Sequence, residues 1–288
     1  RGLAQFVMTG RKQAIIAAGL LGLIPLINLL SPAVVGIVML RKGLQEATFV
    51  FIWGALPLVV WAMLGDIVPL VLLFGITGLT WLLRETESWE FTFLAAIAIG
   101  LVIEIYLRLQ PAVLDAVFQQ LKPYFQQNNL QGMELEEIRE TMTTIIGSVY
   151  MFLAIVLTML ARWMQASLFN PGGFQSEIHQ LRIKQKVALI LLGFMLLCSF
   201  GILIPQAWVL YFMIPLVFSG VGLLHAVVAK RKMSSMVLVV FYVLLMLPVV
   251  IQVVVLLALI DSWYDFRARL DQVGEKLTYN LIKNFKTT

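Results

Sequence analysis

Charged residues are scarce in this 288-residue sequence. Only 13% of its residues are Asp, Glu, Lys or Arg, about half the share found in an ordinary soluble domain. Hydrophobic residues make up 60% of the chain, and the mean hydropathy is +0.92. Because a soluble globule needs far more polar surface than this, the composition excludes that class of protein.

Cysteine and histidine are almost absent. The single cysteine, Cys198, excludes an intramolecular disulfide and a thiolate metal cluster, and the two histidines are too few for a histidine metal site. The sequence contains no phosphate-binding Gly-x-x-x-x-Gly-Lys loop and no Gly-x-Ser-x-Gly, His-Glu-x-x-His or Cys-x-x-Cys motif. The sequence therefore predicts a protein that is not an enzyme, without catalytic residues, metal ligands or a cofactor, and its net charge of +5 does not indicate nucleic-acid binding.

Eight apolar runs are long enough to be membrane segments, since a helix needs about 20 apolar residues to cross a bilayer. We predict an all-α, polytopic transmembrane helical bundle that forms a single domain over residues 1–288. The expected segments are 14–40, 47–64, 67–83, 91–107, 142–161, 187–204, 207–229 and 236–260. The first run is expected to be an uncleaved anchor.

The first apolar run contains residues that break helices. Pro25 and Pro32 each remove a backbone donor, and Asn28 lies between them. We therefore expect 14–40 to be a broken span, a hairpin or a re-entrant pair that turns near Ser31 and Pro32. Irregular backbone at membrane depth is covered by protein or by a water-filled cavity, so the break should face the bundle interior.

Basic residues cluster in some of the loops, and this asymmetry predicts the orientation. The N-terminus and the loops that contain 41–42, 162–186 and 230–232 are expected to be cytoplasmic. The acidic insert 110–141 is then extracytoplasmic, and its apolar residues recur at helical spacing, which predicts an amphipathic helix that lies on the membrane, caps the bundle or binds a partner. The amphipathic tail 261–288 is left without an assigned side.

Polar groups within the apolar runs are the candidates for ligand binding, because an ionisable residue there is costly. Glu104 is the clearest case, and Arg108 follows it at i+4, so the carboxylate either binds a ligand or is satisfied by this pair. Asn28 beside the proline break, Asp66 in an outer turn and Gln252 in the last run are the other candidates. Capping, solvation and interhelical hydrogen bonding are the alternatives for these three residues.

Two features are candidates for protein contacts. Ala14 and Ala18 have the small-residue spacing that allows close helix packing, inside the bundle or against a partner. The cytoplasmic loop contains a strong turn signal that includes Asn170, Gly172 and Gly173. Phe169 and Phe174 flank this turn and could anchor the loop.

Three motifs give the chain a family resemblance. They are Phe-Asn-Pro-Gly-Gly-Phe at 169–174, Leu-Ile-Asp-Ser-Trp-Tyr-Asp-Phe-Arg at 259–267, and the proline-containing segment that precedes Arg41-Lys42-Gly43. With these motifs the chain resembles the YybS-like family of bacterial inner-membrane proteins over nearly its whole length. That family is distantly similar to the substrate-binding subunits of energy-coupling-factor transporters and to the rod-shape protein MreD.

The resemblance implies one of two functions in the bacterial inner membrane. The first is a small-molecule-binding transporter subunit, in which Ala14 and Ala18 match the motif that docks the coupling subunit. From the polar residues within the apolar runs and the broken first segment, we expect its pocket to open to the outer face, with Glu104 as the polar anchor and with Asn28, Asp66 and Gln252 also lining it. The second is a non-catalytic, MreD-like scaffold that recruits proteins in the membrane or cytoplasm. With either function, membrane lipid surrounds the protein and is one of its binding partners.

Overall fold

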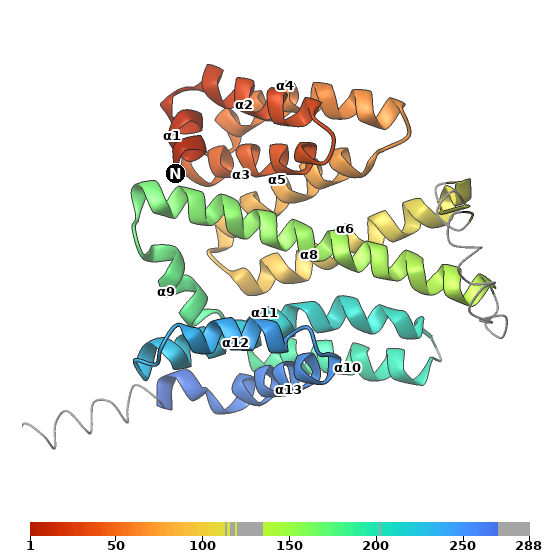
Figure 1. The fold of residues 1–288 in the computed structure, drawn as a ribbon, viewed down its shortest axis with the longest axis vertical. Coiled ribbons are helices and arrows are strands. Elements are labelled where there is room, and N and C mark those ends of the chain that lie inside the picture. The colour runs from red at the N-terminus through yellow and green to blue at the C-terminus, as the bar shows by residue number, and fades with distance from the viewer. Residues whose placement is uncertain (113, 116–118, 120–134, 202, 270–288) are drawn as a thin grey trace, which may run out of the picture. The chain divides into compact units, whose positions relative to one another are not determined.

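A computed structural model describes residues 1–112, 114, 115, 119, 135–201 and 203–269, and these residues are almost entirely helical and contain no strand (Figure 1). The chain divides into two compact units, a division that hydropathy does not reveal. Unit 1 comprises Arg1–Gly172 and Cys198–Tyr211, and unit 2 comprises Gly173–Leu197 and Phe212–Thr288. Most of the insert 110–141 and the tail from residue 270 onward lie outside the described residues.

Unit 1 holds the N-terminal helices and one later turn. Its elements are α1 (Gly2–Thr9), α2 (Arg11–Leu23), η1 (Ile27–Leu30), α3 (Ser31–Lys42), α4 (Leu44–Met63), α5 (Val68–Thr86), α6 (Trp89–Leu109), α8 (Leu135–Phe169) and η2 (Gln206–Trp208). Unit 2 is built from the remaining helices, which are α9 (Gly173–Gln180), α10 (Gln185–Phe200), α11 (Val209–Lys230), α12 (Met236–Leu244) and α13 (Pro248–Tyr264). The end of α10 and the first turn of α11 belong to unit 1.

The helices confirm the predicted fold class. Five stretches of the described residues are long and apolar enough to cross a membrane: Leu44–Met63, Val68–Thr86, Trp89–Leu109, Ile138–Phe169 and Gln206–Lys230. The pairs α9–α10 and α12–α13, bent by 63° and 114°, raise the number to seven if each pair is one span. These seven correspond to seven of the eight predicted segments, and the fold fits a multi-pass α-helical membrane protein.

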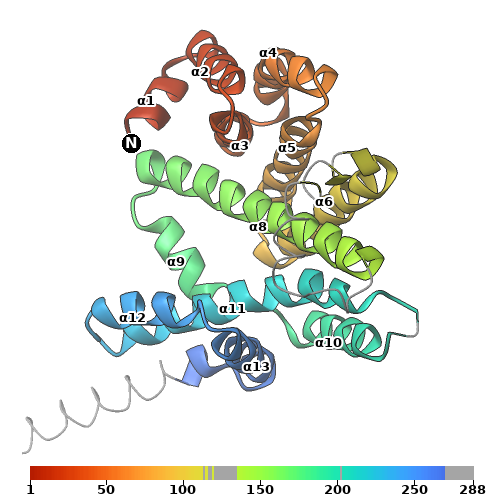
Figure 2. The ribbon, with the colours of Figure 1, turned by 45° about the vertical axis from the view of Figure 1, so that its right-hand side comes forward.

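The remaining predicted segment, 14–40, is broken, as its prolines indicated. Helix α2 ends at Leu23, and α3 returns to pack against both α1 and α2, so the segment forms a hairpin (Figure 2). The turn lies at 24–30, slightly earlier than predicted, and it includes Leu26 with a positive φ of 66°. Pro32 instead lies in the first turn of α3, where a missing N–H costs no helical hydrogen bond.

Helix α3 is the centre of unit 1. Its first nine residues, 31–39, are all buried, and the helix packs against α4, α5 and α8. Ser31 begins this buried stretch and donates a hydrogen bond from its Oγ to the carbonyl of Ala18 over 2.9 Å. A short polar side chain thereby joins the two arms of the hairpin within an otherwise apolar core.

Candidate functional site

Glu104 is a buried carboxylate in α6, with only 1% of its surface exposed. Its Oε1 accepts hydrogen bonds from Arg108 Nη2 at 2.7 Å and Nε at 3.0 Å, from Trp208 Nε1 at 2.9 Å and from Thr144 Oγ1 at 3.1 Å. Its Oε2 accepts one from the Tyr211 hydroxyl at 2.7 Å. Ionised groups are buried only when they are paired in this way. The predicted pair with Arg108 is therefore present, and three further donors share the carboxylate.

The donors around Glu104 come from segments far apart in the sequence. Arg108 follows one turn later on α6, Thr144 lies on α8, and Trp208 and Tyr211 belong to η2 and the first turn of α11. The carboxylate thus connects three parts of unit 1. Because hydrogen bonds to a charged acceptor are stronger than neutral ones, this cluster fixes the geometry of that end of the bundle.

Two glycines make room for the cluster where α6 and α8 cross. A Cβ atom on Gly100 would lie 2.5 Å from the Tyr211 ring and 3.0 Å from the Gly147 carbonyl oxygen. A Cβ atom on Gly147 would overlap the Tyr211 hydroxyl and lie 2.8 Å from the Gly100 carbonyl oxygen. Only glycine at both positions therefore allows the two helices and the fully buried Tyr211 to pack together.

Replacing Gly147 by alanine is expected to lower the free energy of unfolding by about 1–3 kcal/mol, because the added methyl group must displace the Tyr211 hydroxyl or a helix backbone. The matched control is Gly78→Ala in α5, where an added Cβ meets nothing within 4 Å. Denaturant unfolding in detergent micelles measures both variants. Equal stability of the two variants would contradict the close contact.

A small polar cavity of about 190 Å³ adjoins the Glu104 cluster in unit 1. It is large enough to hold several water molecules. The residues that line it are Leu107, Arg108, Leu114, Arg139, Glu140 and Thr143. Two guanidinium groups and one carboxylate therefore face one small space.

The charged groups of this cavity are partly engaged with one another. Arg108 Nη1 lies 3.4 Å from Glu140 Oε1. Arg139 Nη2 donates to Asp115 Oδ1 at 2.8 Å and to the carbonyl oxygen of Pro111 at 3.1 Å. Both acidic partners are more than half exposed, so these ion pairs are easily exchanged for other contacts. The cavity can therefore offer both positive and negative groups to a small polar molecule.

The other three predicted ligand residues lie elsewhere. Asn28 is buried in η1, and Asp66 is exposed in the turn before α5, where its Oδ1 accepts a hydrogen bond from the Val68 amide at 3.3 Å. Among the described residues, no hydrogen bond or ion pair connects either of them to Glu104. Gln252 belongs to unit 2, where it is exposed on α13. The capping and solvation alternatives fit Asp66.

The predicted partner residues divide into a buried and an exposed group. Ala14 and Ala18 are buried, and a Cβ atom on Gly54 of α4 would lie 3.1 Å from the Ala18 methyl group, so this spacing serves packing within unit 1. Phe169 is exposed at the end of α8, with the Arg41 guanidinium carbon 4.1 Å from its ring centroid.

The predicted turn follows Phe169 and joins α8 to α9. Asn170 and Gly172 are exposed, and Gly172 has φ +87°, a conformation that requires glycine. Gly173 begins α9, and Phe174 is half-buried in its first turn. The turn signal in the sequence was therefore correct, and the turn coincides with the boundary between the two units.

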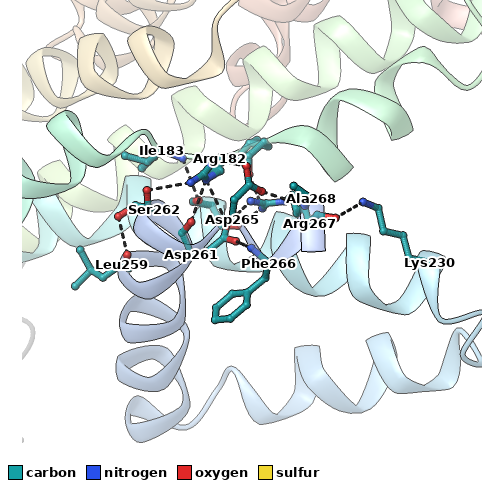
Figure 3. A network of polar contacts seen from close by, with 12 residues as sticks. Arg182, Ile183, Lys230, Leu259, Asp261, Ser262, Asp265, Phe266, Arg267 and Ala268 are labelled. Atoms are coloured by element: carbon teal, nitrogen blue, oxygen red, sulfur yellow. Dashed lines mark hydrogen bonds and ion pairs between the residues drawn. The ribbon is translucent and has the colours of Figure 1, made fainter. Parts of the chain in front are cut away.

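Unit 2 contains a second polar cluster, which Figure 3 shows at the end of α13. Asp261 is fully buried and forms an ion pair with the buried Arg267, and its Oδ1 accepts the Phe266 amide at 2.9 Å. Arg267 Nη2 donates to the carbonyl oxygens of Leu181 at 2.7 Å and Ser219 at 3.1 Å. One ion pair thus fastens the end of α13 to the segment after α9 and to α11.

A second arginine completes the cluster in unit 2. Arg182 donates to the carbonyl oxygens of Asp261 and Ser262, both at 3.0 Å, and to Asp265 Oδ2 at 2.6 Å, as Figure 3 shows. These bonds satisfy carbonyl groups at the C-terminal end of α13, where a helix leaves its last acceptors unpaired. Burial lowers the pKa of the Arg267 guanidinium, and the charge of Asp261 opposes that shift, so Arg267 stays protonated.

Sequence reasoning did not predict most partners in either cluster. Trp208 and Tyr211 lie in the apolar run 207–229, and no pattern in that run indicated Glu104 as their partner. Asp261 and Arg267 stood out only as parts of a sequence motif. The signal available in the sequence was Asp261, directly after an apolar run, with the opposite charge of Arg267 six positions later.

Comparisons with protein-family models, with curated protein sequences and with solved structures found no match to this chain. The resemblance to the YybS-like family therefore stays a prediction, and the functional argument rests on the geometry of the two clusters.

Proposed function

We propose that this chain is a small-molecule-binding protein of the bacterial inner membrane, and that it acts as a substrate-binding subunit of a transporter. The ligand is held in the 190 Å³ cavity beside Glu104. The observation that carries this proposal is a fully buried carboxylate within an apolar helix, held by donors from three segments at the edge of a polar cavity. Ionisable groups in membrane segments are costly and mark ligand or ion sites.

The hydrogen bonds of the charged side chains indicate which of them orients the site and which bind the ligand. Glu104 is occupied by protein donors, so it orients Arg108 rather than binding the ligand through both oxygens. Arg108, Arg139 and Glu140 face the cavity. Apart from Glu104, the ion-pair partners that these three side chains have among the described residues are exposed. A ligand with an acidic and a basic group, such as a zwitterion of amino-acid size, matches the charges and volume of this space.

The proposal is tested by extracting the protein with its lipids into polymer nanodiscs and identifying co-purified small molecules by mass spectrometry. We expect a small polar molecule with the native protein, and a reduction of about tenfold or more in Arg139→Gln, because a hydrogen bond to a charged group is lost. Arg139 is partly exposed, so this variant should still fold.

The matched control for this experiment is Asp66→Asn, which removes a charge from an exposed turn of the same unit that does not line the cavity. It should retain as much of the small molecule as the native protein does. If the native protein co-purifies only with lipid, or if Arg139→Gln and Asp66→Asn retain equal amounts of the small molecule, the proposed ligand-binding function is wrong. That result would favour the scaffold alternative.

A further inference from the structure

An apolar groove of about 480 Å³ runs along unit 1 between α2 and α4. These two helices are parallel, because Arg11 pairs with Glu46 near their N-terminal ends and Trp61 Nε1 donates to the Gly22 carbonyl near their C-terminal ends. The groove is lined by Ile15, Ile16, Gly19, Leu20, Leu23, Trp53, Leu56, Pro57 and Val60. On α2 the lining extends over eight residue steps, or about 12 Å of helix.

Each wall of the groove follows one stripe of its helix. Ile16, Gly19 and Leu23 have i, i+3 and i+7 spacing on α2 and therefore share a face. Gly19 leaves open space there, since a Cβ atom at this position meets nothing within 4 Å. Lys12 lies four residues, or about one helical turn, before Ile16 on the same face of α2, at the polar end of the groove.

The polar end of the groove has an excess of positive charge. Arg11, Lys12 and Lys42 are exposed there, against the single carboxylate of Glu46. Arg11 is engaged by Glu46 through two hydrogen bonds, of 2.5 and 3.0 Å, and its guanidinium lies over the Phe49 ring. Lys12 forms no hydrogen bond or ion pair within the part of the chain that the structure describes, so its ammonium group is available to an anion.

We propose that this groove binds an anionic phospholipid, with one acyl chain between α2 and α4 and the phosphate of the headgroup at Lys12. The groove supplies a mostly apolar surface about 12 Å long, which covers most of the roughly 15 Å hydrocarbon thickness of one leaflet. The positive charge at its end complements the phosphate of an anionic headgroup. A second copy of this chain is the competing occupant. It would bring another apolar helix but would leave Lys12 without a counter-charge.

The lipid site is tested by native mass spectrometry of the full chain in detergent, titrated with phosphatidylglycerol or phosphatidylcholine. We expect tighter binding of one phosphatidylglycerol. Gly19→Leu fills the groove and should weaken that binding about tenfold, because about two methylene groups lose their contact. Lys12→Gln should weaken phosphatidylglycerol binding about fivefold and phosphatidylcholine binding less, because the choline cation offsets the phosphate charge that Lys12 meets.

Two matched controls separate the site from general effects on the protein. Gly78→Leu places the same side chain into open space on α5, and Lys186→Gln removes an exposed lysine at the start of α10. Both should bind phosphatidylglycerol as the native protein does. Equal effects of Gly19→Leu and Gly78→Leu, or equal affinities for the two lipids, would overturn the proposal. A native dimer that Gly19→Leu converts to a monomer would assign the groove to a second copy instead.

Discussion

Replacing Asp261 by alanine is expected to lower the free energy of unfolding by about 3–5 kcal/mol, because the buried Arg267 guanidinium then loses its counter-charge. The same substitution removes the acceptor of the Phe266 amide. Arg267 would keep its bonds to two backbone carbonyls, but those dipoles do not neutralise a full charge. Chemical denaturation of the protein in detergent micelles, followed by circular dichroism, measures the loss.

Two further variants show whether the effect comes from the buried charge. Asp265→Ala removes a carboxylate that is 40% exposed, and it should cost no more than about 1 kcal/mol. In the double variant Asp261→Leu with Arg267→Met, no charge is left unpaired, so it should be more stable than Asp261→Ala. If Asp261→Ala and Asp265→Ala were equally mild, the buried ion pair would not hold the end of α13.

Glu104→Gln should give the second largest loss, about 2–4 kcal/mol. The amide keeps the shape of the side chain but removes the charge that Arg108 pairs with. Its NH₂ group replaces one carboxylate oxygen and accepts no hydrogen bond, so either Trp208 or Tyr211 loses its acceptor. Thermal unfolding in nanodiscs measures the loss.

The matched comparison for Glu104→Gln is Tyr211→Phe, which removes only one donor from the same carboxylate. It should cost about 1–2 kcal/mol and leave the ion pair with Arg108 intact. A Glu104→Gln variant as stable as the native protein would show that the carboxylate is not needed to connect α6, α8 and η2.

Short-range patterns in the sequence were sufficient for the local features. The i+4 spacing of Glu104 and Arg108 predicted their ion pair, and the two prolines in 14–40 predicted the break between α2 and α3. Apolar run lengths located five segments that single helices reproduce, and two more that the structure divides into bent helix pairs. In these cases the residues that give the pattern lie within one or two helical turns of the feature that they predict, so local backbone geometry is sufficient for the prediction.

Long-range partners could not be predicted in this way. Trp208 reaches Glu104 across 104 positions, and Arg182 reaches Asp261 across 79, and no periodicity encodes such pairs. The close crossing at Gly100 and Gly147 is equally hidden, because small residues are common in membrane helices. The first boundary between the two units falls between Gly172 and Gly173, which the sequence marked only as a turn.

The most direct test of the ligand-binding function is a high-resolution electron cryo-microscopy structure of the native protein in lipid nanodiscs. The proposal predicts compact, non-lipid density in the cavity between Leu107 and Thr143, in contact with Arg108 and Arg139 and absent from the Arg139→Gln variant. A cavity closed by protein side chains, or one with the same isolated water density in both variants, would contradict it.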